Sequence, residues 1–190
     1  CNNIVFGNNK FVAVGFSLYN SLAYSLDGIT WTGLGKGVFN NECTGIAYNG
    51  TMWVATGSTN NSLAYSSDGI TWTGLGNSIF SYGSNVEWIN GMWIAGGEGP
   101  TNTMAYSFDG ITWTGLGNNI FSLRCSGVAF NGTRWVAVGS GTNSIAYSSD
   151  GITWTGLGNI FYFIYGIEWD GSKFIVAGVA NNPLDYSLMD

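Results

Sequence analysis

Two glutamates, Glu87 and Glu168, are the side chains whose type and spacing could support acid–base catalysis. A glycoside hydrolase needs two carboxyl groups in one cleft, one to donate a proton and one to act as base or nucleophile. Both glutamates occupy one position of an internal repeat, where other repeats have Val5, Ala47 and Ala129. The alternative is that the two acids line the mouth or wall of a central channel, and this is the interpretation we favour.

The composition excludes most other catalytic chemistry. The chain has no His, which removes Ser-His-Asp and Cys-His nucleophile systems and nearly all zinc sites. There is no C-x-x-C spacing, so we expect no metal and no cofactor. Lys plus Arg is 5 against 11 for Asp plus Glu, a net charge of −6, which argues against nucleic acid as a partner. We therefore expect a protein that is not an enzyme.

A 13-residue segment recurs with few changes, as AYSLDGITWTGLG from Ala23 and as close copies from Ala64, Ala105 and Ala146. Its aspartates follow one another at intervals of 41 residues: Asp27, Asp68, Asp109 and Asp150. Self-similarity with a period of 40–45 residues is typical of a four-stranded blade of a β-propeller.

Each repeat divides into short strands separated by hairpin turns. In the second repeat we expect strands at 45–48, 52–56, 61–66 and 70–73, with turns at Asn49-Gly50 and Asp68-Gly69. The first three strands occur five times and the fourth only four times. The prediction is an all-β, five-bladed β-propeller forming one domain over 1–190, with repeats at about 1–40, 41–82, 83–122, 123–162 and 163–190, whose fifth blade lacks its outer strand.

The end of the fifth repeat differs from the others, because Pro183 and Asp185 occur only there. A sheet edge without a partner strand is commonly protected by proline and charge. We therefore expect an open edge at Leu184, Asp185 and Tyr186, either bare or covered by another chain or by a segment outside these residues.

The S-x-D-G-x-T-W core resembles the Asp-box (BNR) repeat of sialidase-like propellers, with one residue fewer between Asp and Gly. The resemblance implies that the box is a structural turn, carried here by Asp27, Asp68, Asp109, Asp150, Trp31, Trp72, Trp113 and Trp154. It also implies that the boxes lie away from any active site. Sialidases of this family bind a carboxylate with three arginines, whereas this chain has only Arg124 and Arg134. Sialidase activity is therefore not expected.

Two further sets of residues recur and could form a ligand-binding face. An Asn opens the third strand of every repeat, and a Phe follows the fourth strand of four repeats: Asn20, Asn61, Asn102, Asn143, Asn182, Phe39, Phe80, Phe121 and Phe161. An amide beside an aromatic ring is a common way to hold a sugar. Alternatively, Asn caps a turn and Phe fills the gap between blades. The sequence leaves both interpretations open.

Three cysteines, Cys1, Cys43 and Cys125, share one repeat position. A disulfide between adjacent blades would have to join Cys1 and Cys43, with Cα atoms within about 7 Å. Common ancestry of the repeats explains the three cysteines more simply.

The sequence supports two functions of different classes. The first is an interaction or structural module of an extracellular, cell-surface or virion assembly, consistent with the low charged fraction of 8%. The second is a multivalent glycan-binding propeller, and a glycoside hydrolase is a distant third. Partners would be other protein chains or glycans, and no apolar run is long enough to predict a transmembrane segment.

Overall fold

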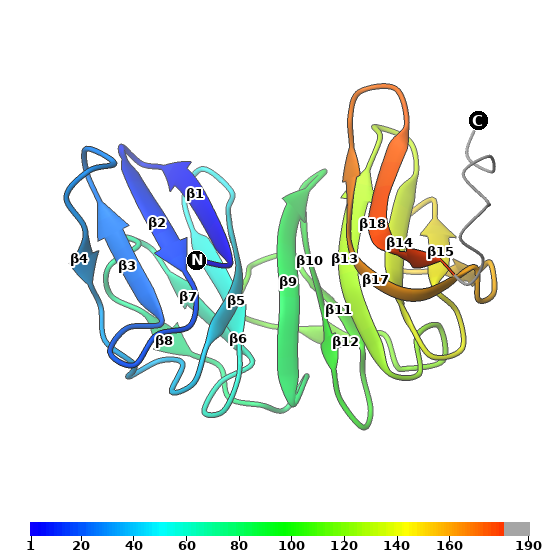
Figure 1. The fold of residues 1–190 in the computed structure, drawn as a ribbon, viewed down its shortest axis with the longest axis horizontal. Coiled ribbons are helices and arrows are strands. Elements are labelled where there is room, and N and C mark those ends of the chain that lie inside the picture. Colours follow the sequence, from blue (N-terminus) through cyan, green and yellow to red (C-terminus); the bar gives the residue numbers. More distant parts are fainter. Residues whose placement is uncertain (181–190) are drawn as a thin grey trace.

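The computed structural model describes residues 1–180, which form strands and turns and contain no helix. Consecutive strands pair in antiparallel fashion into four four-stranded sheets and one two-stranded sheet (Figure 1). The strands of blade 1 are β1 (Asn3–Gly7), β2 (Lys10–Val14), β3 (Leu22–Ser25) and β4 (Thr32–Gly33). Those of blade 2 are β5 (Cys43–Tyr48), β6 (Trp53–Gly57), β7 (Leu63–Ser66) and β8 (Thr73–Gly74).

The remaining blades repeat this order. Blade 3 contains β9 (Tyr82–Ile89), β10 (Met92–Glu98), β11 (Met104–Ser107) and β12 (Thr114–Gly115). Blade 4 contains β13 (Arg124–Phe130), β14 (Trp135–Ser140), β15 (Ile145–Ser148) and β16 (Thr155–Gly156). Blade 5 contains β17 (Phe161–Trp169) and β18 (Phe174–Ala180). The predicted third strand of this blade, at Leu184, Asp185 and Tyr186, lies outside the described residues, so a five-bladed propeller with a three-stranded fifth blade stays a prediction.

The first hairpin of each blade follows directly from its turn sequence. In blade 2 the Asn49 Oδ1 atom accepts hydrogen bonds from the backbone N–H groups of Thr51 and Met52, at 2.9 and 2.7 Å. Gly50 supplies a φ of +99°, which a residue with a side chain rarely adopts. This turn sets Tyr48 opposite Trp53, and the two rings stack with centroids 4.4 Å apart.

The fourth strand is shorter than predicted. We expected residues 70–73 in blade 2, whereas β8 covers only Thr73–Gly74. The Asp68 carboxylate accepts the N–H groups of Ile70 and Thr71, both at 2.7 Å, so these donors serve the turn and not a strand ladder. The expectation of a four-residue strand was wrong because the Asp box extends further along the chain than its Asp-Gly pair.

The sheets of blades 2, 3 and 4 each pack against both neighbouring blades through opposite faces. We call the face toward the preceding blade the upstream face and the face toward the following blade the downstream face. In blade 2 the upstream face includes Ile46 and Trp53, and the downstream face includes Val54 and Leu63. All four side chains are at most 2% exposed. The core is therefore a series of apolar layers between blades.

The blades follow one another along an arc, with blade 1 on the left of the view and blades 4 and 5 overlapping on the right (Figure 1). The first strands of adjacent blades contact one another, as β1 does β5, β5 does β9, β9 does β13 and β13 does β17. Within residues 1–180, the extensive contacts of β17 are with β18, β13 and β14 and not with blade 1. The described chain is an open arc of blades.

Candidate functional site

The Asp boxes form self-contained turns at the outer hairpins. In the first box Asp27 Oδ1 accepts the Ser25 hydroxyl at 3.0 Å and the backbone N–H groups of Ile29 and Thr30 at 2.8 and 2.7 Å. The Ser25 hydroxyl oxygen in turn accepts the N–H of Gly28 at 2.9 Å. The same bonds recur in the other three boxes. One oxygen of each aspartate is therefore committed to the turn.

These bonds hold the box aspartates in the charged form. The backbone N–H groups of Thr30 and Ile29 lower the pKa of Asp27 from 3.8 to about 2. Burial alone would raise the pKa of Asp68, but its backbone and hydroxyl donors outweigh this and lower it to about 2. A carboxyl group with so low a pKa is a poor proton donor at neutral pH. The boxes stabilise turns, as the sequence resemblance implies.

The recurring asparagines join each blade to the preceding loop. Asn61 Oδ1 accepts the N–H of Gly76 at 2.7 Å, while its Nδ2 donates to the Val38 carbonyl at 2.7 Å. Asn143 makes the same pair of bonds in blade 4. Asn20 and Asn102 likewise accept backbone N–H groups. Asn182 lies outside the described residues.

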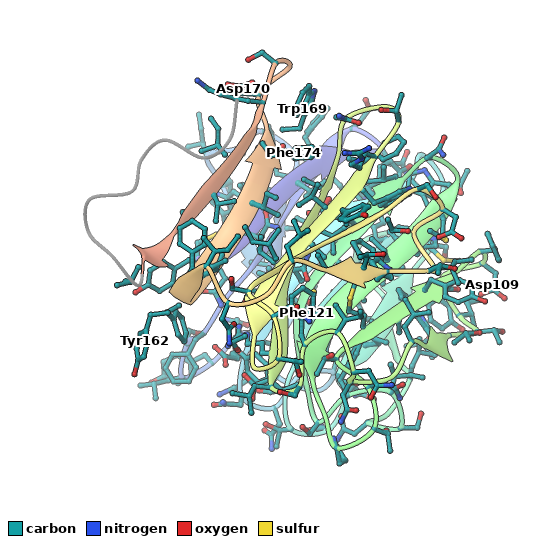
Figure 2. All side chains as sticks on the ribbon, turned by 90° about the vertical axis from the view of Figure 1, so that its right-hand side faces the viewer. Asp109, Phe121, Tyr162, Trp169, Asp170 and Phe174 are labelled. Atoms are coloured by element: carbon teal, nitrogen blue, oxygen red, sulfur yellow. The ribbon has the colours of Figure 1, made fainter. Side chains whose placement is uncertain are left out.

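The recurring phenylalanines fill the spaces between blades. Phe39, Phe80 and Phe121 are at most 1% exposed, so none of these rings has a face open to a ligand. Figure 2 shows Phe121 in the interior, whereas Asp109 lies at the periphery. Phe161 is partly exposed. The geometry favours the packing alternative for Phe39, Phe80 and Phe121, and glycan binding at the recurring Asn and Phe residues stays a prediction.

Glu87 and Glu168 interact electrostatically. Burial and, to a smaller extent, the negative charge of Glu168 together raise the pKa of Glu87 from 4.5 to about 7. Glu87 is partly buried on β9, and Glu168 is exposed on β17, two blades away. This places both acids on the first strands of their blades, as expected for residues near a central channel. Their lining of such a channel stays a prediction.

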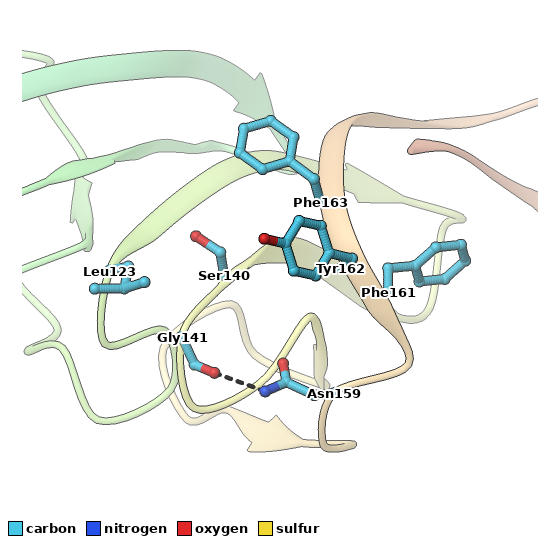
Figure 3. A pocket seen from close by; sticks show the side chains of 7 residues that line it. All are labelled: Leu123, Ser140, Gly141, Asn159, Phe161, Tyr162 and Phe163. Carbon is cyan, nitrogen blue, oxygen red and sulfur yellow. Dashed lines mark hydrogen bonds between the residues drawn. The ribbon is translucent and has the colours of Figure 1, made fainter. Parts of the chain in front are cut away.

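One hollow of about 410 Å³ lies where the chain passes from blade 4 into blade 5 (Figure 3). Its aromatic wall is formed by Tyr162 and Phe163, and the opposite wall by Leu123 and Ser140, while Phe161 lines the hollow with its ring directed away from them. Tyr162 is 78% exposed and Leu123 65% exposed. The floor is braced by a hydrogen bond of 2.8 Å from the Asn159 amide to the Gly141 carbonyl.

This hollow was missed by the reasoning from sequence. The signal was the run Phe161-Tyr162-Phe163-Ile164-Tyr165, which stands where the other repeats have smaller or polar residues after the recurring Phe. Only Ile164 of this run is fully buried, at 2% exposure. The run therefore places aromatic side chains on the surface.

The cysteines form no disulfide. Cys1 is exposed, whereas Cys43 and Cys125 are buried. Burial raises the pKa of the Cys125 thiol to about 12 and that of Cys43 well above 9.0, so both are poor nucleophiles. The described residues include no cluster of His, Cys, Asp and Glu that could hold a metal ion. They also include no helix of the length and hydropathy that crossing a bilayer requires.

Comparison with known proteins identifies the architecture. No protein-family model matches the chain, and no curated protein does. Solved structures do match. The chain is similar to one in a nidogen–laminin complex, with 16% identity, a TM-score of 0.69 and coverage of 92% of this chain and 70% of that chain. The chain therefore has a β-propeller fold.

Two further structures give the same result. The GH74 enzyme of Niastella koreensis matches with 17% identity and a TM-score of 0.70 over 92% of this chain, but only 34% of the enzyme is covered. YCF48 from Cyanidioschyzon merolae matches with 15% identity and a TM-score of 0.64 over 98% of this chain and 70% of that one. At these identities the likeness concerns the fold alone.

Proposed function

We propose that this chain is a non-enzymatic propeller of the Asp-box type that acts as an interaction or structural module in an extracellular, cell-surface or virion assembly. The observation that carries the proposal is the exposure of large apolar side chains at both ends of the arc. Examples are Phe6 at 58% in blade 1 and Tyr162 at 78% in blade 5. Apolar side chains gathered on a surface commonly mark a site of protein–protein contact.

The chemistry of the acids supports a role without catalysis. The box aspartates accept hydrogen bonds within their own turns, and the low pKa of Asp27 and Asp68 leaves them charged at neutral pH. Glu87 is the carboxyl group whose pKa would suit proton donation, but its neighbouring acid, Glu168, is exposed on a different blade. The hollow near blade 5 is lined by neither glutamate.

Two of the similar structures contain propellers bound to proteins. One is a complex of nidogen with laminin, and another is YCF48 bound to a D1 peptide. The GH74 neighbour is an enzyme, so the fold by itself permits either role. The surface of this chain is therefore what favours interaction over catalysis.

Glycan binding is the second candidate function. It is favoured by the exposed Tyr162 ring beside Ser140 in the hollow, because an aromatic face with a nearby hydroxyl suits a sugar ring. This location differs from the Asn and Phe set named from the sequence, of which only Phe161 lines the hollow.

Purified protein incubated with a panel of glycosides, and separately applied to a glycan array, distinguishes the three roles. An interaction module gives neither turnover nor saturable glycan binding. Turnover that is abolished by Glu87→Gln would replace the proposal with a hydrolase. Glycan binding that is abolished by Tyr162→Ala, with Tyr19→Ala as an equally exposed control at 79%, would establish the lectin alternative.

A further inference from the structure

The upstream face of blade 1 is exposed, although the same face is buried in the blades that follow. Ile4 is 49% exposed, whereas the equivalent side chains in blades 2, 3 and 4 are 2, 1 and 4% exposed: Ile46, Val86 and Val128. Phe6 and Trp31 lie on this face as well, at 58% and 39% exposure. Blade 1 thus presents an interface of the kind that joins neighbouring blades, without a blade against it.

The downstream face of blade 5 is exposed in the same way. Ile175 is 49% exposed, whereas the equivalent side chains in blades 1, 2 and 3 are all 0% exposed: Val12, Val54 and Ile94. Val179, which shares a face of β18 with Ile175, is 49% exposed as well. Within residues 1–180, the arc therefore ends in one unpaired upstream face and one unpaired downstream face.

The interface between blades 1 and 2 shows how two such faces fit. A Cβ atom added at Gly69 would lie 3.1 Å from Cγ2 of Val12, so the valine packs against the glycine of the next Asp box. Lys10 Nζ donates to the Asp68 carbonyl at 2.6 Å across the same interface. For the equivalent glycine of blade 1, Gly28, the three atoms nearest to an added Cβ all belong to Phe11 of its own blade.

The open faces carry the residues needed to repeat these contacts. Ile175 occupies the position of Val12, and Lys173 occupies the position of Lys10. The Asp27-Gly28 turn that they would meet has the same geometry as the Asp68-Gly69 turn. The two ends of the chain thus carry the residues that could form an apolar layer and a hydrogen bond from a charged lysine between them.

From this match we infer that a second copy of the chain packs its upstream blade 1 face on the downstream blade 5 face of the first. The inference rests on the proposed function, because it names the partner of an interaction module. The occupant is a second copy because the two faces continue the interface that already joins neighbouring blades within the chain. A head-to-tail contact of this kind closes into a ring if the curvature permits and otherwise extends into a filament.

A disulfide tests the contact directly. Between blades 2 and 3, a Cβ atom added at Gly83 would lie 2.8 Å from Cβ of Thr56. Cys1 occupies the position of Gly83, and Ala177 occupies the position of Thr56, so Ala177→Cys should bring a new thiol near the exposed Cys1 of the second copy. Mild oxidation is expected to give covalent dimers or a ladder on a non-reducing gel. Ala177→Cys combined with Cys1→Ser is the matched control and should stay monomeric.

Two other results would overturn the inference. The absence of a cross-link in the Ala177→Cys variant would show that these faces do not meet. An internal disulfide in a monomer, detected by mass spectrometry, would show that the arc closes on itself.

Charged substitutions provide a second, independent test. Ile175→Asp and Phe6→Asp, both at exposed positions, should each weaken self-association of the full chain at least about tenfold in sedimentation velocity. A mixture of the two variants retains one intact face of each kind, so it should form a one-to-one dimer. Failure of the mixture to associate would refute head-to-tail packing. Wild-type protein that stays monomeric at about 100 μM would refute the inference. It would leave the proposed function unaffected, because the glycoside and glycan assays test that function separately.

Discussion

Neutralising Glu87 should remove most of the pH dependence of stability between pH 5 and pH 8. Burial first, and then the charge of Glu168, together raise the pKa of this carboxyl from 4.5 to about 7. The folded state therefore holds a proton that the unfolded state has released. A raised folded-state pKa gives stability that is present at low pH and is lost as the pH rises through the window from 4.5 to about 7.

The size of the effect follows from the change in pKa. A change from 4.5 to about 7 corresponds to at most roughly 3 kcal/mol of unfolding free energy. Because Glu87 is only partly buried, we expect a loss of about 1–3 kcal/mol between pH 5 and pH 8. The chain has no His, so no imidazole titrates in this window, and the box aspartates, whose pKa is lowered, titrate well below it.

Urea denaturation at pH 5 and pH 8 measures this difference. Wild-type protein should have a lower midpoint at pH 8, whereas Glu87→Gln should have nearly equal midpoints. Glu168→Gln should reduce the pH dependence only in part, because it removes the neighbouring charge but not the burial. A wild-type midpoint that is equal at both pH values, or an undiminished decrease in Glu87→Gln, would refute the assignment of the buried proton to this residue.

Three further outcomes follow from the contacts. Trp72→Ala should lower the free energy of unfolding by about 2–4 kcal/mol in thermal or urea unfolding, because Trp72 packs against blade 1. Trp31→Ala, at the same position of blade 1 but 39% exposed, should lower it by about 1 kcal/mol or less in dilute protein. Equal losses in the two variants would contradict the packing argument. Asn61→Ala should lower the urea midpoint, because it removes bonds to Gly76 and Val38, and should leave any glycan binding unchanged. The stability given by the low pKa of Asp109 should persist above pH 4 and be lost as the pH falls toward 2, which acid titration followed by circular dichroism measures. Asp109→Asn should flatten that part of the curve. An acid transition of this variant like that of the wild type would count against this role of Asp109.

The sequence was sufficient to predict the local structure of each blade. The 41-residue period, the Asn49-Gly50 turn and the Asp68-Gly69 turn predicted antiparallel sheets, and the structure has them. The fourth strand was overestimated because the reach of the Asp68 carboxylate along the chain is a matter of turn geometry that spacing does not show. The role of the recurring Asn and Phe residues could not be predicted. The sequence does not distinguish an Asn whose amide bonds to the protein backbone from one whose amide binds a ligand.

The open ends of the arc could not be predicted from sequence for a different reason. Ile4 and Ile46 stand at the same position in similar repeats, yet one is 49% exposed and the other 2%. The difference depends on whether another blade lies against the face, which is set by the curvature of the whole arc and not by any local pattern. The hollow formed by Leu123, Tyr162 and Phe163 is likewise created by packing of blade 5 on blade 4.

The central claim is that the two exposed ends of this propeller pack against each other in neighbouring copies of the chain, and the most direct measurement is sedimentation velocity of the wild-type chain over a range of concentrations. The account predicts a monomer when dilute and a species of at least twice the monomer mass as the concentration rises, with the increase lost in Ile175→Asp. A single monomeric species at every concentration, unchanged by that substitution, would contradict it.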